Sequence, residues 1–100
     1  MPKSATTKTR NVNPGVDGLR ISQEKYDAVR KAILKAIPRG RTGLLFKDLP
    51  KAVAQCVPAE LFPKRGSASW YTTVVKLDLE ARGVLRRVPG EVPQRLIRVK

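Results

Sequence analysis

The feature that most constrains the fold is the segment 67–88, which encodes one helix that runs into one strand. With side chains about 100° apart around a helix, its apolar residues cover more than half of the circumference. These residues are Trp70, Tyr71, Val74, Val75, Leu77 and Ala81. A helix that buries so much of its surface must be packed among other elements, as the last helix of a three-helix core is. We therefore expect Trp70 to lie in the core.

The residues after this helix predict a β-hairpin. Gly83 supplies the helix stop, because glycine readily takes the left-handed conformation that is common just after a helix. Two β-rich runs, 84–88 and 95–99, then bracket Pro89 and Gly90. Proline followed by glycine suits the centre of a type II turn. We expect an antiparallel hairpin with a short loop at its tip.

The first helix is predicted directly after a basic N-terminal arm. Residues 1–21 offer almost nothing apolar to bury, so we expect a flexible arm. Its cations are Lys3, Lys8, Arg10 and Arg20. Ser22 then offers an N-cap, and apolar residues recur at helical spacing until Pro38 ends the helix. These apolar residues are Tyr26, Val29, Ile33 and Ile37. The folded domain is expected to span residues 22–100.

A short strand and a second helix are predicted between the first and third helices. Leu44 and Leu45 suffice for one short strand. Pro50 marks the first turn of the second helix, because its missing N–H would have no intrahelical partner there, and Pro58 ends this helix. The order helix, strand, helix, helix, hairpin predicts a mainly α fold with a small β-hairpin (α+β). More specifically, it predicts a winged helix-turn-helix with three helices plus a C-terminal wing.

The stretch LEARGVLRR at residues 79–87 supports this topology by resemblance. It resembles the pattern with which many bacterial winged-helix regulators pass from the recognition helix into the wing. Lys76 stands where that pattern usually keeps an apolar residue. The chain is also similar to a small uncharacterised bacterial family with a winged-helix type domain. The stretches that carry this second similarity are Asn11–Gly15, Lys25–Tyr26, Leu61–Pro63 and Trp70.

A polar strip runs along the third helix beside its apolar arc. The strip comprises Ser69, Thr72, Thr73 and Lys76, with Glu80 at its far end. Short hydroxyl side chains allow a helix to approach base edges closely, so we expect the strip to enter the major groove of duplex DNA. A solvated or partner-facing surface is the alternative. Asp78 interrupts the apolar arc, and we expect it to pair with Arg82 or Arg86.

The charge of the chain indicates a polyanionic partner. Lys and Arg number 21 against 8 Asp and Glu, which gives a net charge of +13. Such a field attracts nucleic acids. The wing would place Arg86, Arg87 and Arg95 near phosphates, and Lys64 and Arg65 would extend the contact. These arginines equally suit the solvated face of an edge hairpin.

We therefore expect a nucleic-acid-binding protein, above all a binder of duplex DNA, that acts as a small regulator or an accessory nucleoid protein. Two alternatives stay open: a protein-interaction module with an acidic partner, and an RNA-binding or ribosome-associated protein. The target sequence, any effector and the oligomeric state are left open as well.

Enzymatic chemistry has no support in the sequence. The chain has no histidine, which is the commonest general acid or base, and its single cysteine excludes an internal disulfide. We predict no catalytic residue, no metal site and no cofactor, and we expect Cys56 to be a buried apolar residue. The uncharged stretches are far shorter than the roughly 20 residues of a membrane span, so a cytoplasmic protein with no membrane contact is expected.

Overall fold

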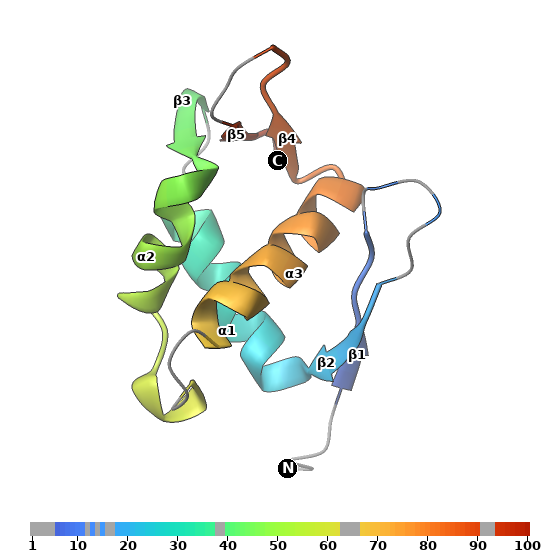
Figure 1. Cartoon of the computed structure of the whole chain (residues 1–100), viewed down its shortest axis with the longest axis vertical. Coiled ribbons are helices and arrows are strands. Elements are labelled where there is room, and N and C mark those ends of the chain that lie inside the picture. Colours follow the sequence, from blue (N-terminus) through green and yellow to red (C-terminus); the bar gives the residue numbers. More distant parts are fainter. Residues whose placement is uncertain are drawn as a thin grey trace.

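The structure is a computed structural model of the chain and describes residues 6–11, 13, 15, 18–37, 40–62, 67–90 and 94–100. The described helices are α1 (Gln23–Ala36), α2 (Leu49–Ala54) and α3 (Ser67–Ala81), with short 3-10 turns η1 (Phe46–Asp48) and η2 (Ala59–Leu61). The described strands are β1 (Thr6–Lys8), β2 (Arg20–Ser22), β3 (Gly40–Leu45), β4 (Leu85–Arg87) and β5 (Arg95–Arg98). The fold is mixed α+β, with three helices and two small sheets in the described part (Figure 1).

Helix α3 is the centre of the core. It packs against both α1 and α2 and crosses in front of α1 in Figure 1. Its Val75 and Leu79 are fully buried, as are Val29 and Ile33 of α1 and Val53 of α2. Each such side chain contributes roughly 1.5–3 kcal/mol on burial. The predicted burial of the apolar faces of α1 and α3 is confirmed at these positions.

The predicted start of α1 and the predicted end of α3 are confirmed. The Ser22 side chain caps α1 by accepting a hydrogen bond from the Lys25 N–H at 3.4 Å. Gly83 follows α3 with a φ of +76°. Its N–H donates to the Glu80 carbonyl at 3.1 Å, and the next N–H, of Val84, donates to the Leu79 carbonyl at 2.9 Å. This cap turns the chain directly from α3 into the hairpin.

The predicted C-terminal hairpin is present, and a third strand joins it. Strands β4 and β5 pair antiparallel, and β3 pairs with the other edge of β5, so the order is β3-β5-β4. Strand β3 is longer than the two residues that we predicted. Gly43 has a φ of +61°, and a Cβ there would lie 2.1 Å from the Leu96 carbonyl oxygen. Glycine therefore permits the close approach of β3 to β5.

The N-terminal segment is a second small sheet. Strands β1 and β2 pair antiparallel from Thr6 opposite Ser22 to Lys8 opposite Arg20. Thr9 is 3% exposed and its hydroxyl donates to the Leu19 carbonyl at 3.0 Å. The expectation of a flexible arm over residues 1–21 is therefore wrong for residues 6–8 and 20–21, which form paired strands, and Ile21 is buried in the core. Residues 1–5 lie outside the described part.

Two predicted core residues are exposed instead. Trp70 is 50% exposed, and its neighbour Tyr71 packs inward against Phe62, with ring centroids 5.4 Å apart. Cys56 is exposed because α2 ends at Ala54 and the cysteine lies in the following turn. The helical spacing of Leu49, Val53 and Cys56 suggested that Cys56 is buried, but the helix ends before it reaches Cys56.

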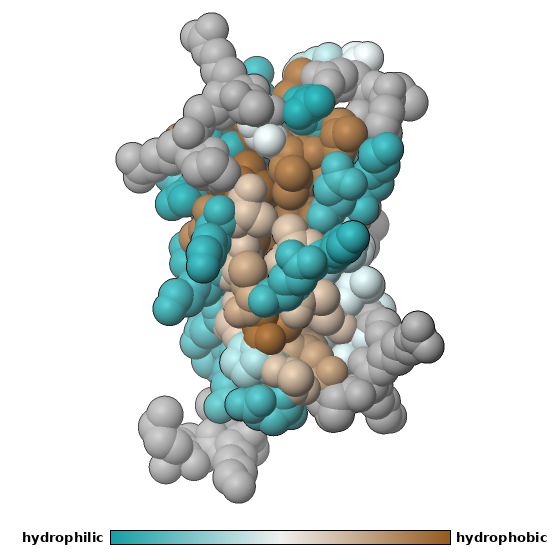
Figure 2. Space-filling view, turned by 90° about the vertical axis from the view of Figure 1, so that its left-hand side faces the viewer, coloured by the Kyte–Doolittle hydropathy of each residue, from teal (hydrophilic) through white to brown (hydrophobic). Residues whose placement is uncertain are grey.

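The face that α2 occupies carries a stripe of apolar side chains between hydrophilic ones (Figure 2). A pocket of about 540 Å³ lies between α1 and the turn after α2. Its lining consists of Ala28, Lys31, Ala32, Lys35, Gln55, Cys56 and Pro58. The described walls of this pocket thus combine small apolar groups with two lysines and no carboxylate.

Candidate nucleic-acid interface

Half of the predicted polar strip on α3 is buried. Thr72 is fully buried, and its hydroxyl donates to the Ala68 carbonyl at 2.6 Å, one turn earlier. Lys76 is 3% exposed, and its ammonium lies 4.5 Å from the centroid of the Phe46 ring. The expectation that Thr72 and Lys76 face base edges is therefore wrong, because this side of α3 packs toward η1 and α2.

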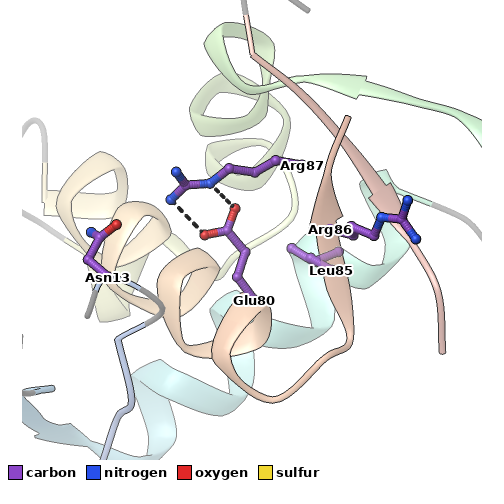
Figure 3. A pocket seen from close by; sticks show the side chains of 5 residues that line it. All are labelled: Asn13, Glu80, Leu85, Arg86 and Arg87. Atoms are coloured by element: carbon purple, nitrogen blue, oxygen red, sulfur yellow. Dashed lines mark hydrogen bonds and ion pairs between the residues drawn. The ribbon is translucent and has the colours of Figure 1, made fainter. Parts of the chain in front are cut away.

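Lys76 belongs to a cluster of three charged groups, in which Lys76 and Glu80 are buried and Arg87 is partly exposed. The Glu80 carboxylate, in a residue 8% exposed, lies 3.4 Å from the Lys76 ammonium. From the hairpin, Arg87 donates to both Glu80 oxygens, through Nε at 2.8 Å and Nη2 at 3.0 Å (Figure 3). Burial lowers the pKa of Lys76, although Glu80 partly offsets this effect. The hydrogen bond to Glu80 raises the pKa of Arg87. The cluster fixes the hairpin against α3.

The predicted arginines of the hairpin differ in their surroundings. Arg87 forms an ion pair with Glu80 of α3. Arg86 projects from the opposite face of β4, away from Glu80, and is exposed (Figure 3). Arg95 is half-buried in β5. Lys64 and Arg65, the predicted cations before α3, lie outside the described residues. Arg86 is thus an exposed hairpin cation that a phosphate can reach.

An open pocket of about 310 Å³ lies beside the ion cluster, lined by Asn13, Glu80, Leu85, Arg86 and Arg87. Both oxygens of its carboxylate are already occupied by Arg87. Within the described ranges, no three His, Cys, Asp or Glu side chains gather in a way that could hold a metal ion. The pocket therefore presents neither an available general base nor a set of metal ligands among the described residues.

The accessible part of α3 is its first half. Ser69, Trp70 and Thr73 are exposed there, and the Thr73 hydroxyl donates to the Ser69 carbonyl at 3.3 Å. Ser69 and Thr73 thus keep the exposure that we predicted for the strip, and Trp70 joins them. The sequence could not separate Trp70 from Tyr71, since both border the apolar arc. The contact of Tyr71 with Phe62 decides which ring turns inward.

Asp78 anchors α3 on its other side. Its carboxylate accepts hydrogen bonds from the Tyr26 hydroxyl, from Arg82 Nε at 2.9 Å and from the backbone N–H of Arg10 at 2.8 Å. The predicted ion pair of Asp78 is therefore confirmed, with Arg82 as the partner. Burial and the adjacent Asp78 raise the pKa of Tyr26 to about 12.

Stability should fall in alkaline solution through Tyr26. Its folded pKa of about 12 lies above the ordinary 10.0, so the folded state holds the phenol proton more tightly than the unfolded chain. This stabilisation is complete below about pH 10 and is lost as the pH rises toward 12, by roughly 2–3 kcal/mol in total. Urea unfolding of the wild type and of Tyr26→Phe as a function of pH measures it. The stability difference between the two proteins should shrink above about pH 10; parallel curves would contradict the assignment.

The chain belongs to the family of unknown function DUF6958, whose model matches residues 6–96. The match includes the N-terminal sheet as well as the three helices and most of the hairpin. Neither a curated protein nor a solved structure matches the chain significantly. None of the helices in the described part has both the length and the apolar character that crossing a membrane requires.

Proposed function

We propose that this member of a family of unknown function is a winged-helix protein that binds nucleic acid, duplex DNA included, through phosphate contacts. The order α1, β3, α2, α3, β4, β5 and the sheet order β3-β5-β4 support the winged helix. The net charge of +13 supports a polyanionic ligand. Contacts to phosphate position a protein on DNA without reading its sequence, so binding is expected to tolerate any sequence.

The observation that carries this proposal is the placement of the carboxylates. On α3, Asp78 and Glu80 are buried, and each is paired with an arginine. The exposed carboxylates of the described residues lie on α1, η1 and η2 instead. They are Glu24, Asp27, Asp48 and Glu60. The described parts of α3 and the hairpin therefore present Arg86 to solvent with no exposed carboxylate beside it to repel a phosphate.

The binding mode differs from the one predicted for the strip. Lys76 and Thr72 are buried, so α3 is left with two exposed hydroxyls and one exposed aromatic ring for contact with a ligand. Bidentate base recognition in the major groove requires accessible donors such as Arg, Lys, Asn or Gln. The described exposed part of α3 has none of these, which favours phosphate contact over base reading.

Replacing Arg86 with alanine tests the proposal. Counterion release makes log affinity fall linearly with log salt, with a slope near −0.9 per phosphate contacted on duplex DNA. Fluorescence anisotropy with a labelled duplex should show such a slope for the wild type, and Arg86→Ala should reduce its magnitude by about 0.9. Two unrelated duplex sequences should bind with similar affinity.

The matched control is Lys31→Ala, which removes one exposed charge from the pocket between α1 and the turn after α2. It should leave the salt slope close to that of the wild type. The proposal fails if the wild type does not bind duplex or single-stranded nucleic acid at low salt. It also fails if binding occurs with no dependence on salt.

A second candidate function is the binding of an acidic protein segment, and the pocket between α1 and the turn after α2 favours it. Lys31 and Lys35 flank small apolar side chains there. The face of the molecule in Figure 2 likewise carries an apolar stripe between hydrophilic borders. An acidic amphipathic peptide complements that combination. For this function the roles of the two variants reverse: Lys31→Ala should weaken peptide binding, and Arg86→Ala should not.

A further inference from the structure

Trp70 is the sole tryptophan of the chain and is 50% exposed. It lies in the first half of α3, between the exposed hydroxyls of Ser69 and Thr73. Trp70 and Thr73 share one face of the helix with Leu77, which lies two turns after the tryptophan and is half-buried. The accessible face of α3 is thus aromatic and apolar, with hydroxyl groups and no charge.

The Trp70 ring is held in place by an aromatic cluster. Its centroid lies 4.9 Å from that of Tyr71, with the ring planes at 88°, and Tyr71 in turn packs against Phe62. The cluster joins α3 to Phe62, the residue that follows η2. Because Tyr71 and Phe62 are half-buried, Trp70 is fixed at its edge while half of its surface faces solvent.

Cations flank this face of α3 at both ends. The Lys25 ammonium lies 5.3 Å from the Tyr71 centroid and 5.8 Å from the Phe62 centroid, one ring away from Trp70. At the other end, exposed Arg10 lines a pocket of about 220 Å³ together with Leu77. An uncharged aromatic surface between two cations matches the chemistry of a nucleotide strand, in which apolar base faces alternate with phosphates.

We propose that Trp70 stacks on an unpaired base, so that the preferred ligand of this face is single-stranded nucleic acid. The proposal rests on the proposed function and adds a ligand class to it. In a duplex each base face is covered by the neighbouring base pair. The described residues of α3 include no exposed cation that could bind the groove of a duplex instead. In a single strand the base faces are available, and aromatic stacking accepts any base.

The test uses Trp70 as its own probe. Oligo(dT) added to the wild type should quench the tryptophan fluorescence, since no other tryptophan contributes. Trp70→Ala should weaken binding of labelled oligo(dT) by roughly 5- to 150-fold, the range that follows from about 1–3 kcal/mol per stacked base. Trp70→Phe should recover part of the loss. Val99→Ala is the matched control, because Val99 is 47% exposed and lies outside this face; it should bind as the wild type does.

The outcomes separate this proposal from the function on which it rests. If Trp70→Ala binds oligo(dT) less tightly but keeps the affinity and salt slope of the wild type on duplex DNA, both are supported. If oligo(dT) leaves the fluorescence unchanged and Trp70→Ala binds it normally, stacking is ruled out. The proposed function is still supported in that case if binding depends on salt and is weakened by Arg86→Ala. If an acidic peptide quenches Trp70 and oligo(dT) does not, the face is a protein-docking surface and the proposal is overturned.

Discussion

Replacing Asp78 with alanine is expected to lower the free energy of unfolding by roughly 3–5 kcal/mol, because a buried ion pair that loses one partner leaves the other groups uncompensated. Asp78 is fully buried and accepts hydrogen bonds from Tyr26, Arg82 and the backbone of Arg10. Its loss would leave the buried Tyr26 hydroxyl without this acceptor and would remove the hydrogen bond between α3 and the backbone of Arg10, which follows β1. Since a domain of this size has a total stability of about 5–15 kcal/mol, much of the protein should unfold at modest urea concentration.

The matched control is Asp27→Ala on α1. Asp27 is exposed and accepts one hydrogen bond, from Gln23 at 2.8 Å, so its loss should change stability by no more than about 0.5 kcal/mol. Urea denaturation followed by circular dichroism measures both variants. Equal midpoints for the two proteins would show that the Asp78 network does not hold α3 in place.

Replacing Glu80 with alanine should destabilise the protein by a similar amount, again roughly 3–5 kcal/mol. Glu80 is the carboxylate within 4 Å of the Lys76 ammonium, which is otherwise left with the face of the Phe46 ring. Arg87 would lose both of its hydrogen bonds to α3, so the hairpin would also be less firmly held. Urea unfolding should therefore show a lower midpoint.

Removing the other partner of the Lys76–Glu80 ion pair should have a much smaller effect on stability. Lys76→Met should cost less than about 1.5 kcal/mol, because Glu80 keeps its two hydrogen bonds from Arg87 and methionine fills the volume of the lysine stem. Adding Lys76→Met to Glu80→Ala should restore most of the lost stability, since the uncompensated ammonium is gone. Failure of this rescue would show that the uncompensated ammonium of Lys76 is not the main cause of the lost stability. Lys76→Met should also leave duplex binding unchanged.

Local signals in the sequence predicted the parts of the fold that local chemistry decides. Ser22 caps α1 and Gly83 ends α3, and each of these depends on residues within a few positions. The predicted turn at Pro89 and Gly90 continues into residues 91–93, which lie outside the described part. The pairing of Asp78 was also predictable, because a carboxylate within an apolar arc requires a cation and Arg82 is one turn away.

Tertiary contacts decided what the sequence could not predict. A helical wheel shows that Lys76 is polar, but its burial depends on Phe46 and on Arg87, which belong to η1 and the hairpin. One signal did exist, since Lys76 occupies a position that is usually apolar in winged-helix regulators. The N-terminal sheet was missed because its two strands are only three residues long and Ile21 is the one apolar residue in them, although that residue is buried in the core.

Nucleic acid is proposed to lie against the exposed Ser69, Trp70 and Thr73 of α3 and against Arg86, without touching the buried Thr72 and Lys76. An amide chemical-shift map recorded by NMR during titration with oligonucleotides tests it most directly. We expect shifts at Ser69, Trp70, Thr73 and Arg86 as oligonucleotide is added. Shifts confined to the pocket between α1 and the turn after α2, around Lys31 and Lys35, would contradict this proposal.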